Sequence, residues 1–158
     1  MSEQTMVIDS PVGRLRLGTD GQSITRVAFV QDPLEHSDSP LLQEVAHQLS
    51  AYFAGERAEF DLPLDPSGTD FQRRVWAALL EVPYGETASY GEIATRLGLP
   101  LSASRAVGLA NGSNPIAIVV PCHRIIGANG SLTGYGGGLD NKRILLQLEQ
   151  GQRDDVLF

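Results

Sequence analysis

Residues 114–126 read NPIAIVVPCHRII and hold the most informative pattern in the chain. The apolar run at 116–120 is too short for a helix and rich in β-branched side chains, so it predicts a buried strand or an extended segment. Cys122, the single cysteine of the chain, follows this run and is itself followed by His123 and Arg124. Free cysteines are commonly inert, buried side chains, but a neighbouring imidazole and guanidinium can stabilise a reactive thiolate. The spacing alone leaves both interpretations of Cys122 open.

Upstream of this stretch, three helices are expected. Capping-box patterns open helices at Thr69 and at Ser89, and Ser102 is suited to cap a third helix that carries Arg105. Ala103, Ala106, Val107 and Ala110 are predicted to share one face of that third helix. A tight Gly/Pro turn separates the second and third helices, which is the outline of a helix-turn-helix of winged-helix-like type. Plain packing of two short helices would produce the same pattern.

Downstream, residues 127–138 contain six glycines around Tyr135 and predict a loop whose backbone can approach a ligand closely. A last helix is expected over 140–149, with Ile144, Leu145 and Leu148 facing inward.

The first part of the chain has a different character. Alternating apolar and polar residues predict strands within 5–30, and an amphipathic helix is expected over 40–54, ending at Gly55. Residues 62–68 contain prolines and a glycine and predict a linker. We therefore expect two domains, a small α/β domain at 1–67 and a mainly α domain at 68–158.

The acidic residues are concentrated in the first of these domains. Residues 1–67 carry four Arg against eleven Asp and Glu, whereas residues 68–158 carry seven Arg and one Lys against eight acidic residues. The net charge of -7 thus comes from the first part, and the second part is neutral. The acidity of the whole chain therefore does not argue against DNA binding by the second part, although its neutral balance is not evidence for such binding. One cysteine cannot form an internal disulfide and fits a cytoplasmic protein. With only three scattered histidines, no metal site is expected, and no stretch is long enough to span a membrane.

The stretch at 114–126 closely resembles the active-site signature of the O6-alkylguanine-DNA alkyltransferases, the methylated-DNA–protein-cysteine methyltransferases. The similarity extends over nearly all of 68–158, through Phe71-Gln72, Val75-Trp76, Pro83-Tyr84-Gly85, Ser89-Tyr90-Gly91, Arg105-Ala106-Val107-Gly108, Gly134 to Gly138 and Lys142 to Glu149. The first part is similar more loosely, through Ser10-Pro11-Val12-Gly13. In this family it forms a ribonuclease-H-like α/β domain without nuclease activity. The resemblance implies repair of double-stranded DNA by one irreversible transfer of an alkyl group from guanine O6 to the protein, without a cofactor.

The resemblance also implies individual roles for the site residues. Cys122 would accept the alkyl group, His123 would take its proton through a water, and Glu149 would orient His123, which is the logic of a catalytic triad with a water inserted. Asn114 would hold the turn before the cysteine segment, and Tyr90 would help rotate the phosphate and protonate the leaving guanine. Taken alone, Glu149 would be interpreted as a solvated residue near a helix end.

The target base lies inside the duplex, so the family has to flip it outward. Arg105 resembles the finger that fills the vacated place, on a helix pair that enters the minor groove. The other implied contacts with DNA or substrate are made by Tyr90, Ala103, Ala106, Gly108, Arg124, Ile125, Tyr135 and Gly136. The turn between Pro100 and Arg105 is one residue longer than is common in the family. We expect a monomer, and the sequence leaves cooperative binding along DNA and O4-alkylthymine as a second substrate open.

Two other functional classes remain to be distinguished. Alkyltransferase-like proteins bind alkylguanine without transfer, but they carry another residue, often Trp, at the position of Cys122. A cysteine hydrolase with a Cys-His-Glu set is the third class. It is disfavoured because Cys122 and His123 are adjacent, and adjacent side chains on an extended chain point apart. They could interact only if the chain turns after Pro121 or a water bridges them.

Overall fold

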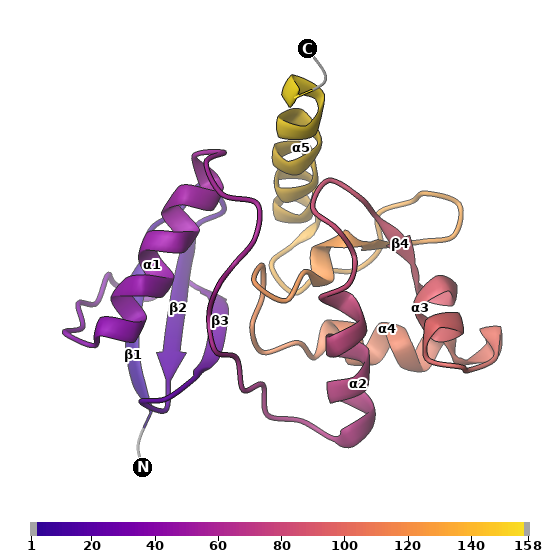
Figure 1. Cartoon of the computed structure of the whole chain (residues 1–158), viewed down its shortest axis with the longest axis horizontal. Coiled ribbons are helices and arrows are strands. Elements are labelled where there is room, and N and C mark those ends of the chain that lie inside the picture. Colours follow the sequence, from indigo (N-terminus) through magenta and orange to yellow (C-terminus); the bar gives the residue numbers. More distant parts are fainter. Residues whose placement is uncertain (1–2, 157–158) are drawn as a thin grey trace.

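The computed structural model describes residues 3–156 and the side chains of residues 3–151, and it consists of an α/β unit beside a mainly helical unit (Figure 1). Strands β1 (Gln4–Ile8), β2 (Arg14–Thr19) and β3 (Ile24–Val30) form an antiparallel sheet in the order β1-β2-β3. Gly13 and Gly21 adopt φ of 95° and 98° in the two connecting turns, a conformation that favours glycine. The strands expected within 5–30 are therefore present.

Helix α1 (Pro40–Phe53) covers one face of the sheet (Figure 1). The Ser39 side chain caps its first turn, accepting from Leu42 N at 3.3 Å, and Gly55 follows its end with φ of 77°. Its buried face packs on the inward side chains of β2, where Leu15 and Leu17 are fully buried. The expected helix over 40–54 is confirmed almost to the residue because its periodicity and both end signals agree.

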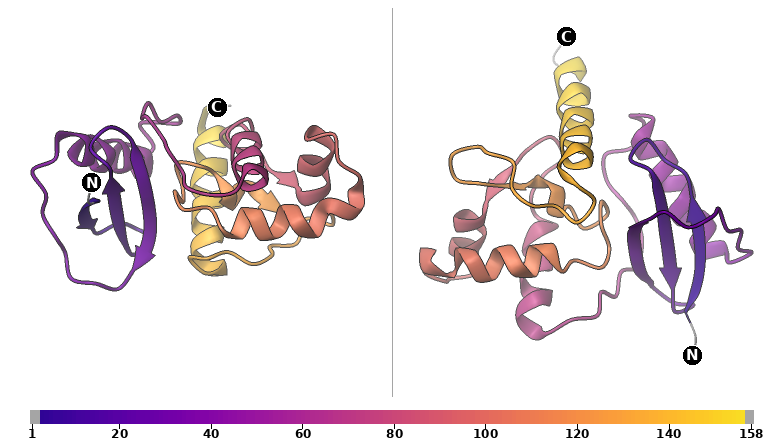
Figure 2. Two further views of the ribbon diagram at one scale, coloured as in Figure 1. Left: turned by 90° about the horizontal axis from the view of Figure 1, so that it is seen from below. Right: turned by 180° about the vertical axis from the view of Figure 1, so that it is seen from behind.

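The second unit is built from helices around the cysteine segment. The capping boxes at Thr69 and Ser89 are both formed, and Trp76 Nε1 of the first helix donates to Ala110 O of the third at 2.8 Å. The elements are α2 (Asp70–Leu79), β4 (Ala88–Ser89), α3 (Tyr90–Arg96), the 3-10 turn η1 (Leu101–Ala103), α4 (Ser104–Gly112), the 3-10 turn η2 (Cys122–Arg124), β5 (Ile125–Ile126) and α5 (Leu139–Val156). Helix α3 lies at the end of this unit away from the sheet (Figure 2).

The start of α4 corrects one prediction. Ser102 lies inside η1 and caps nothing, whereas α4 begins at Ser104 without a side-chain cap. The physical reason is that the longer turn closes on itself, with Ala103 N donating to Pro100 O at 2.9 Å, and runs directly into the helix. Ala106 is exposed, not on the buried face, which holds Val107, Ala110 and Asn111.

The last helix is longer than expected and its inward face differs in part. Helix α5 extends to Val156, seven residues beyond the predicted end at 149. Leu145 is fully buried, but Ile144 is 39% exposed, so its prediction as an inward residue was wrong. Lys142 and Glu149 share the buried face with Leu145 instead, at spacings of three and four residues.

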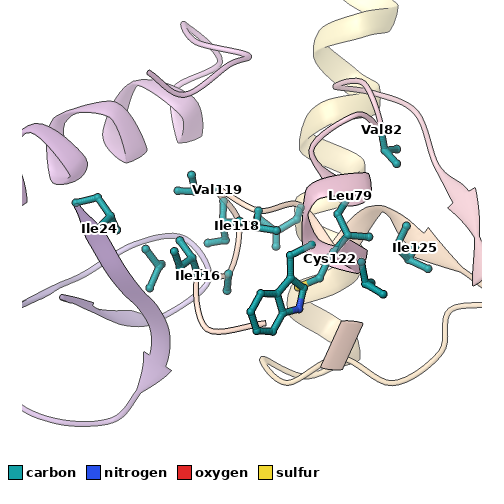
Figure 3. Close-up of a cluster of buried hydrophobic side chains, with 14 of the residues drawn as sticks. Ile24, Leu79, Val82, Ile116, Ile118, Val119, Cys122 and Ile125 are labelled. Carbon is teal, nitrogen blue, oxygen red and sulfur yellow. The ribbon is translucent and has the colours of Figure 1, made fainter. Parts of the chain in front are cut away.

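The apolar run at 116–120 is buried as predicted, but it is not a regular strand. Ile116 forms a parallel bridge with Val27 of β3. The chain then turns through Ile118, whose φ is 72°, so that Val120 N donates to Ile116 O at 3.0 Å. The run lies at the centre of one apolar cluster to which both units contribute (Figure 3). It therefore joins the sheet to the cysteine segment. Within residues 3–156, no helix is long and apolar enough to cross a membrane.

Candidate active site

Cys122 lies at the start of η2, directly after the buried run. Cys122 is 6% exposed and belongs to the apolar cluster shown in Figure 3. Burial raises the pKa of the Cys122 thiol, while the Asn114 side chain and the Lys142 charge act in the opposite direction. The resting group is therefore a protonated thiol, and a nucleophilic role for it requires a base.

Asn114 fixes the shape of the loop that leads to Cys122. Its Nδ2 donates to Val120 O at 2.9 Å, and its Oδ1 accepts from Ile116 N at 3.0 Å. The amide thus holds both ends of the buried run by bonding backbone groups that would otherwise be costly to bury. On the far side of the cysteine, Ile125 of β5 pairs with Ala88 of β4, directly before α3.

Glu149 of α5 is the centre of a buried hydrogen-bond network. One oxygen, Oε2, accepts from Tyr52 OH at 2.5 Å, from His123 Nε2 at 2.7 Å and from Arg124 Nη2 at 3.0 Å. Oε1 accepts from Arg124 Nε at 2.8 Å. Burial alone would raise the pKa of Glu149, but the hydrogen bonds and charges of His123 and Arg124 outweigh it and lower the pKa to about 2. Glu149 is therefore an ionised carboxylate.

The charge of Glu149 determines which nitrogen of His123 carries the proton. Burial lowers the pKa of His123, so the ring is neutral at neutral pH. An ionised carboxylate can only accept, so Nε2 must donate and Nδ1 must carry the lone pair. Nδ1 is buried, and no polar atom of the described residues lies within hydrogen-bond distance of it. The arrangement leaves a neutral imidazole with one nitrogen available as a base.

Arg124 is buried in the same network. It is 7% exposed, its Nη1 donates to Val82 O at 2.8 Å, and its guanidinium lies 5.7 Å from the centre of the Tyr84 ring. Its Nε and Nη2 donate to Glu149, so this buried charge is paired with a carboxylate and hydrogen-bonded through all three of its nitrogens.

Lys142 is a second buried cation near the thiol. Its Nζ donates to Ile125 O at 2.5 Å and to Thr133 O at 3.0 Å, and no carboxylate of the described residues forms an ion pair with it. Burial lowers the pKa of Lys142, and its charge favours the thiolate form of Cys122. It also ties the glycine-rich loop to β5.

A cavity of about 500 Å³ adjoins Cys122, within the usual size range of small-molecule sites. The helical unit contributes Asn114, Cys122 and Tyr135 to its wall, and β3 contributes residues 25–29. A second hollow runs along the outer side of α4, past Tyr90, Arg105, Gly108 and Leu109. The two hollows share Gly112 and the loop residues Gly134, Tyr135 and Gly136. The surface of α4 therefore leads to the cysteine.

Two family models match successive parts of the chain. The ribonuclease-like domain of 6-O-methylguanine DNA methyltransferase matches residues 5–66, and the DNA-binding domain of the same protein matches residues 70–151. The chain belongs to the 6-O-methylguanine DNA methyltransferase family.

Relatives in this methyltransferase family are similar over nearly their whole length. The methylated-DNA–protein-cysteine methyltransferase of Mycobacterium bovis is 56% identical over 151 residues, which is 92% of this chain and 91% of the relative. That of Methanosarcina acetivorans is 53% identical, covering 90% and 96%. Among solved structures, Mycobacterium tuberculosis O6-methylguanine methyltransferase has a TM-score of 0.87 at 54% identity, covering 96% and 94% of the two chains. Mycobacterium tuberculosis OGT in complex with DNA has a TM-score of 0.86 at 55% identity, covering 94% and 93%.

The structure places the site residues expected of a methyltransferase in three groups. Cys122, His123 and Glu149 are buried in the core, the half-buried Asn114 holds the loop that leads to Cys122, and Cys122 and Asn114 also line the cavity. The group along the outer hollow consists of Tyr90, Arg105 and Gly108, with Ala103 and the exposed Ala106 on the same helix-turn-helix, and with Tyr135 and Gly136 at its junction with the cavity. Arg124 and Ile125 line neither space.

Three residues of the methyltransferase site were not predicted from the sequence. Tyr52 comes from the α/β unit, and Thr133 Oγ1 lies 2.5 Å from Tyr90 OH. Lys142 was named only as the single lysine and as the start of the family-like stretch 142–149, without a role in the site. The spacing of Lys142, Leu145 and Glu149 could have revealed that both charged residues lie on a buried helix face. No local signal identifies the partner of Tyr52, which lies 97 residues away.

Proposed function

We propose that the protein repairs alkylated double-stranded DNA by transferring the alkyl group of O6-alkylguanine to Cys122. The observation that carries the proposal is a buried thiol on a cavity that opens toward α4, backed by a neutral His123 and an ionised Glu149. The names of the methyltransferase relatives, and the solved complex of one of them with DNA, support the same activity.

The residues of the core divide the chemistry between them. His123 Nδ1 takes the thiol proton through a bridging water, and Glu149 stabilises the imidazolium that forms. The Cys122 sulfur then forms a bond to the alkyl carbon, and the bond from that carbon to guanine O6 breaks. Tyr90 supplies a proton to N3 of the leaving guanine, so that neutral guanine is released. The thioether has no route back to a thiol, so each protein molecule acts once.

Lys142 and Arg124 assist without contacting the base. The Lys142 charge lowers the cost of forming the thiolate in a buried site. Arg124 holds Glu149 ionised and oriented through their buried ion pair. This role fits the position of Arg124 better than the contact with substrate that was expected from the sequence. Both side chains are positioning residues in this account.

DNA recognition is assigned to the surface of α3 and α4. Arg105 is exposed on α4 beside the outer hollow, where it fills the place of a base flipped toward Cys122. The small residues Ala103, Ala106 and Gly108 let the helix come close to sugar and phosphate. We assign recognition and transfer to residues 68–158 and support to residues 1–67, in a protein that acts in the cytoplasm.

A single experiment tests the proposal. The intact protein is incubated with duplex DNA containing one O6-methylguanine and weighed, with the same duplex carrying guanine as control. A gain of about 14 Da per chain that Cys122→Ala abolishes is the expected result for covalent transfer. Binding without a gain in mass would assign the protein to the non-catalytic readers. Neither binding nor mass gain would overturn the assignment.

A further inference from the structure

Two hollows of the molecule meet at one aromatic side chain of β3. The cavity beside Cys122 has a volume of about 500 Å³. A neighbouring hollow of about 590 Å³ is lined by residues 12–14, Val30, Gln31 and Asn141. Both are bounded by Phe29, Gly136 and Gly137. Since the two glycines have no side chains, Phe29 is the side chain that separates the two spaces.

The Phe29 ring is packed tightly against the glycine-rich loop. It meets the Tyr135 ring edge to face, with centroids 5.6 Å apart and planes at 76°. A methyl group on Gly137 would lie 2.5 Å from Phe29 Cε2, closer than such atoms can approach. Phe29 itself is held by the pairing of β3 with β2, opposite Leu15. The ring therefore forms a stop on the α/β unit, and the loop packs against it.

The position of the Phe29 ring matters for the size of the alkyl group that is transferred. In an in-line displacement the sulfur and the leaving O6 lie on opposite sides of the reacting carbon, so any larger substituent on that carbon projects sideways. The apolar part of the wall of this cavity is formed by Ala117, Tyr135 and the β3 residues Val27, Ala28 and Phe29. A bulky substituent would extend toward this wall and meet the ring.

We infer that Phe29 limits the size of the O6 substituent that the protein accepts, which makes the α/β unit part of the substrate site. This inference rests on the proposed transfer to Cys122. Truncating Phe29 joins the two hollows and gives a large substituent room that a methyl group does not need. Apolar pockets discriminate between substituents by about tenfold or more when the fit changes by one or a few carbon atoms.

The test compares two substituents in the same duplex. Transfer rates are measured by intact mass for O6-methylguanine and O6-benzylguanine in one oligonucleotide sequence. Phe29→Ala is expected to raise the benzyl-to-methyl rate ratio by about tenfold or more, and Phe29→Leu by a smaller factor. Phe53→Ala is the matched control, because Phe53 is also half-buried on the α/β unit but lines a different hollow. Its ratio should equal that of the wild type.

A reciprocal pair of variants tests the contact itself. Gly137→Ala should slow methyl transfer, because the new methyl group collides with the Phe29 ring, and adding Phe29→Ala or Phe29→Leu should restore the rate. An unchanged ratio in both Phe29 variants, or a Gly137→Ala defect that neither variant relieves, would overturn the inference. If Phe29→Ala does not fold, Phe29→Leu alone and combined with Gly137→Ala decides the matter. A wild-type protein that accepts no methyl group would instead refute the proposed function, before any variant is compared.

Discussion

Replacing Tyr52 with phenylalanine removes one hydroxyl group and leaves the buried ring in place. In the native protein this hydroxyl donates to Glu149 Oε2 at 2.5 Å, and both side chains are fully buried. A hydrogen bond to a charged group contributes about 1.5–3 kcal/mol to stability. We therefore expect Tyr52→Phe to lower the free energy of unfolding by about 2 kcal/mol. In a chain of this size that loss corresponds to a decrease in Tm of about 4–8 °C.

The pH dependence of this loss gives the prediction its specificity. The folded-state pKa of Glu149, about 2, lies below its ordinary value of 4.5. The stability contributed by the carboxylate is thus fully present above pH 4.5 and is lost as the pH falls toward 2. A protonated carboxyl group is a weaker acceptor than a carboxylate. The unfolded state is the same in both proteins, so the difference between wild type and Tyr52→Phe should be constant from neutral pH into mild acid and shrink only as the pH approaches the folded-state pKa of about 2.

Urea denaturation from pH 7 downward, followed by circular dichroism, measures this difference. Tyr84→Phe is the control, since it removes the same group near Glu149, and no hydrogen bond from the Tyr84 hydroxyl is found among residues 3–151. The control should change the unfolding free energy by less than about 0.5 kcal/mol. A Tyr52→Phe protein as stable as the wild type at pH 7, or one whose deficit persists undiminished as the pH approaches 2, would refute the assignment of this bond.

The remaining predictions concern the transfer reaction. Glu149→Gln should slow transfer by about a hundredfold or more, measured by quenched reaction and intact mass, and a rate within threefold of the wild type would contradict its role. Because burial lowers the pKa of His123, the acid limb of the rate profile should lie below the imidazole's ordinary 6.5, and a midpoint above that value would count against it. Arg105→Ala should impair repair of duplex DNA more than reaction with free O6-benzylguanine, whereas equal losses would remove the finger role. Lys142→Met should raise the pH at which iodoacetamide alkylates Cys122, and an unchanged pH dependence would argue against electrostatic assistance.

The sequence predicted the elements whose signals are local. The capping boxes at Thr69 and Ser89 set two helix starts, and the periodicity over 40–54 set a third helix with both of its ends. The prediction for Ser102 was wrong because residues 101–103 form a 3-10 turn that runs directly into α4, which the capping pattern does not reveal. Of the two alternatives expected for 116–120, a buried strand or an extended segment, the regular strand did not form, for a different reason. An apolar run reports burial, but the turn at Ile118 depends on the Asn114 amide and on β3.

The site was predictable only in part, because much of it depends on contacts between distant parts of the chain. Cys122 and His123 are visible in the sequence because their chemistry is unusual at the end of an apolar run. The partners of Glu149 come from three separated parts of the chain, and burial of its carboxylate is a property of the assembled fold. The spacing along α5 could have indicated that Glu149 is buried, but taken alone the residue was interpreted as solvated, and nothing local to Tyr52 indicated that the α/β unit reaches the site. The resemblance to the alkyltransferases supplied the role of Glu149 that local patterns do not.

The measurement that tests the central claim most directly is the stoichiometry of transfer. The protein is incubated with a large molar excess of duplex carrying O6-methylguanine, and the methyl groups per chain are counted by peptide mass analysis over time. We expect the count to rise to one, the methyl group to lie on the peptide containing Cys122, and no further O6-methylguanine to be consumed. Repair of many duplexes by each chain, or a methyl group on any other residue, would contradict it.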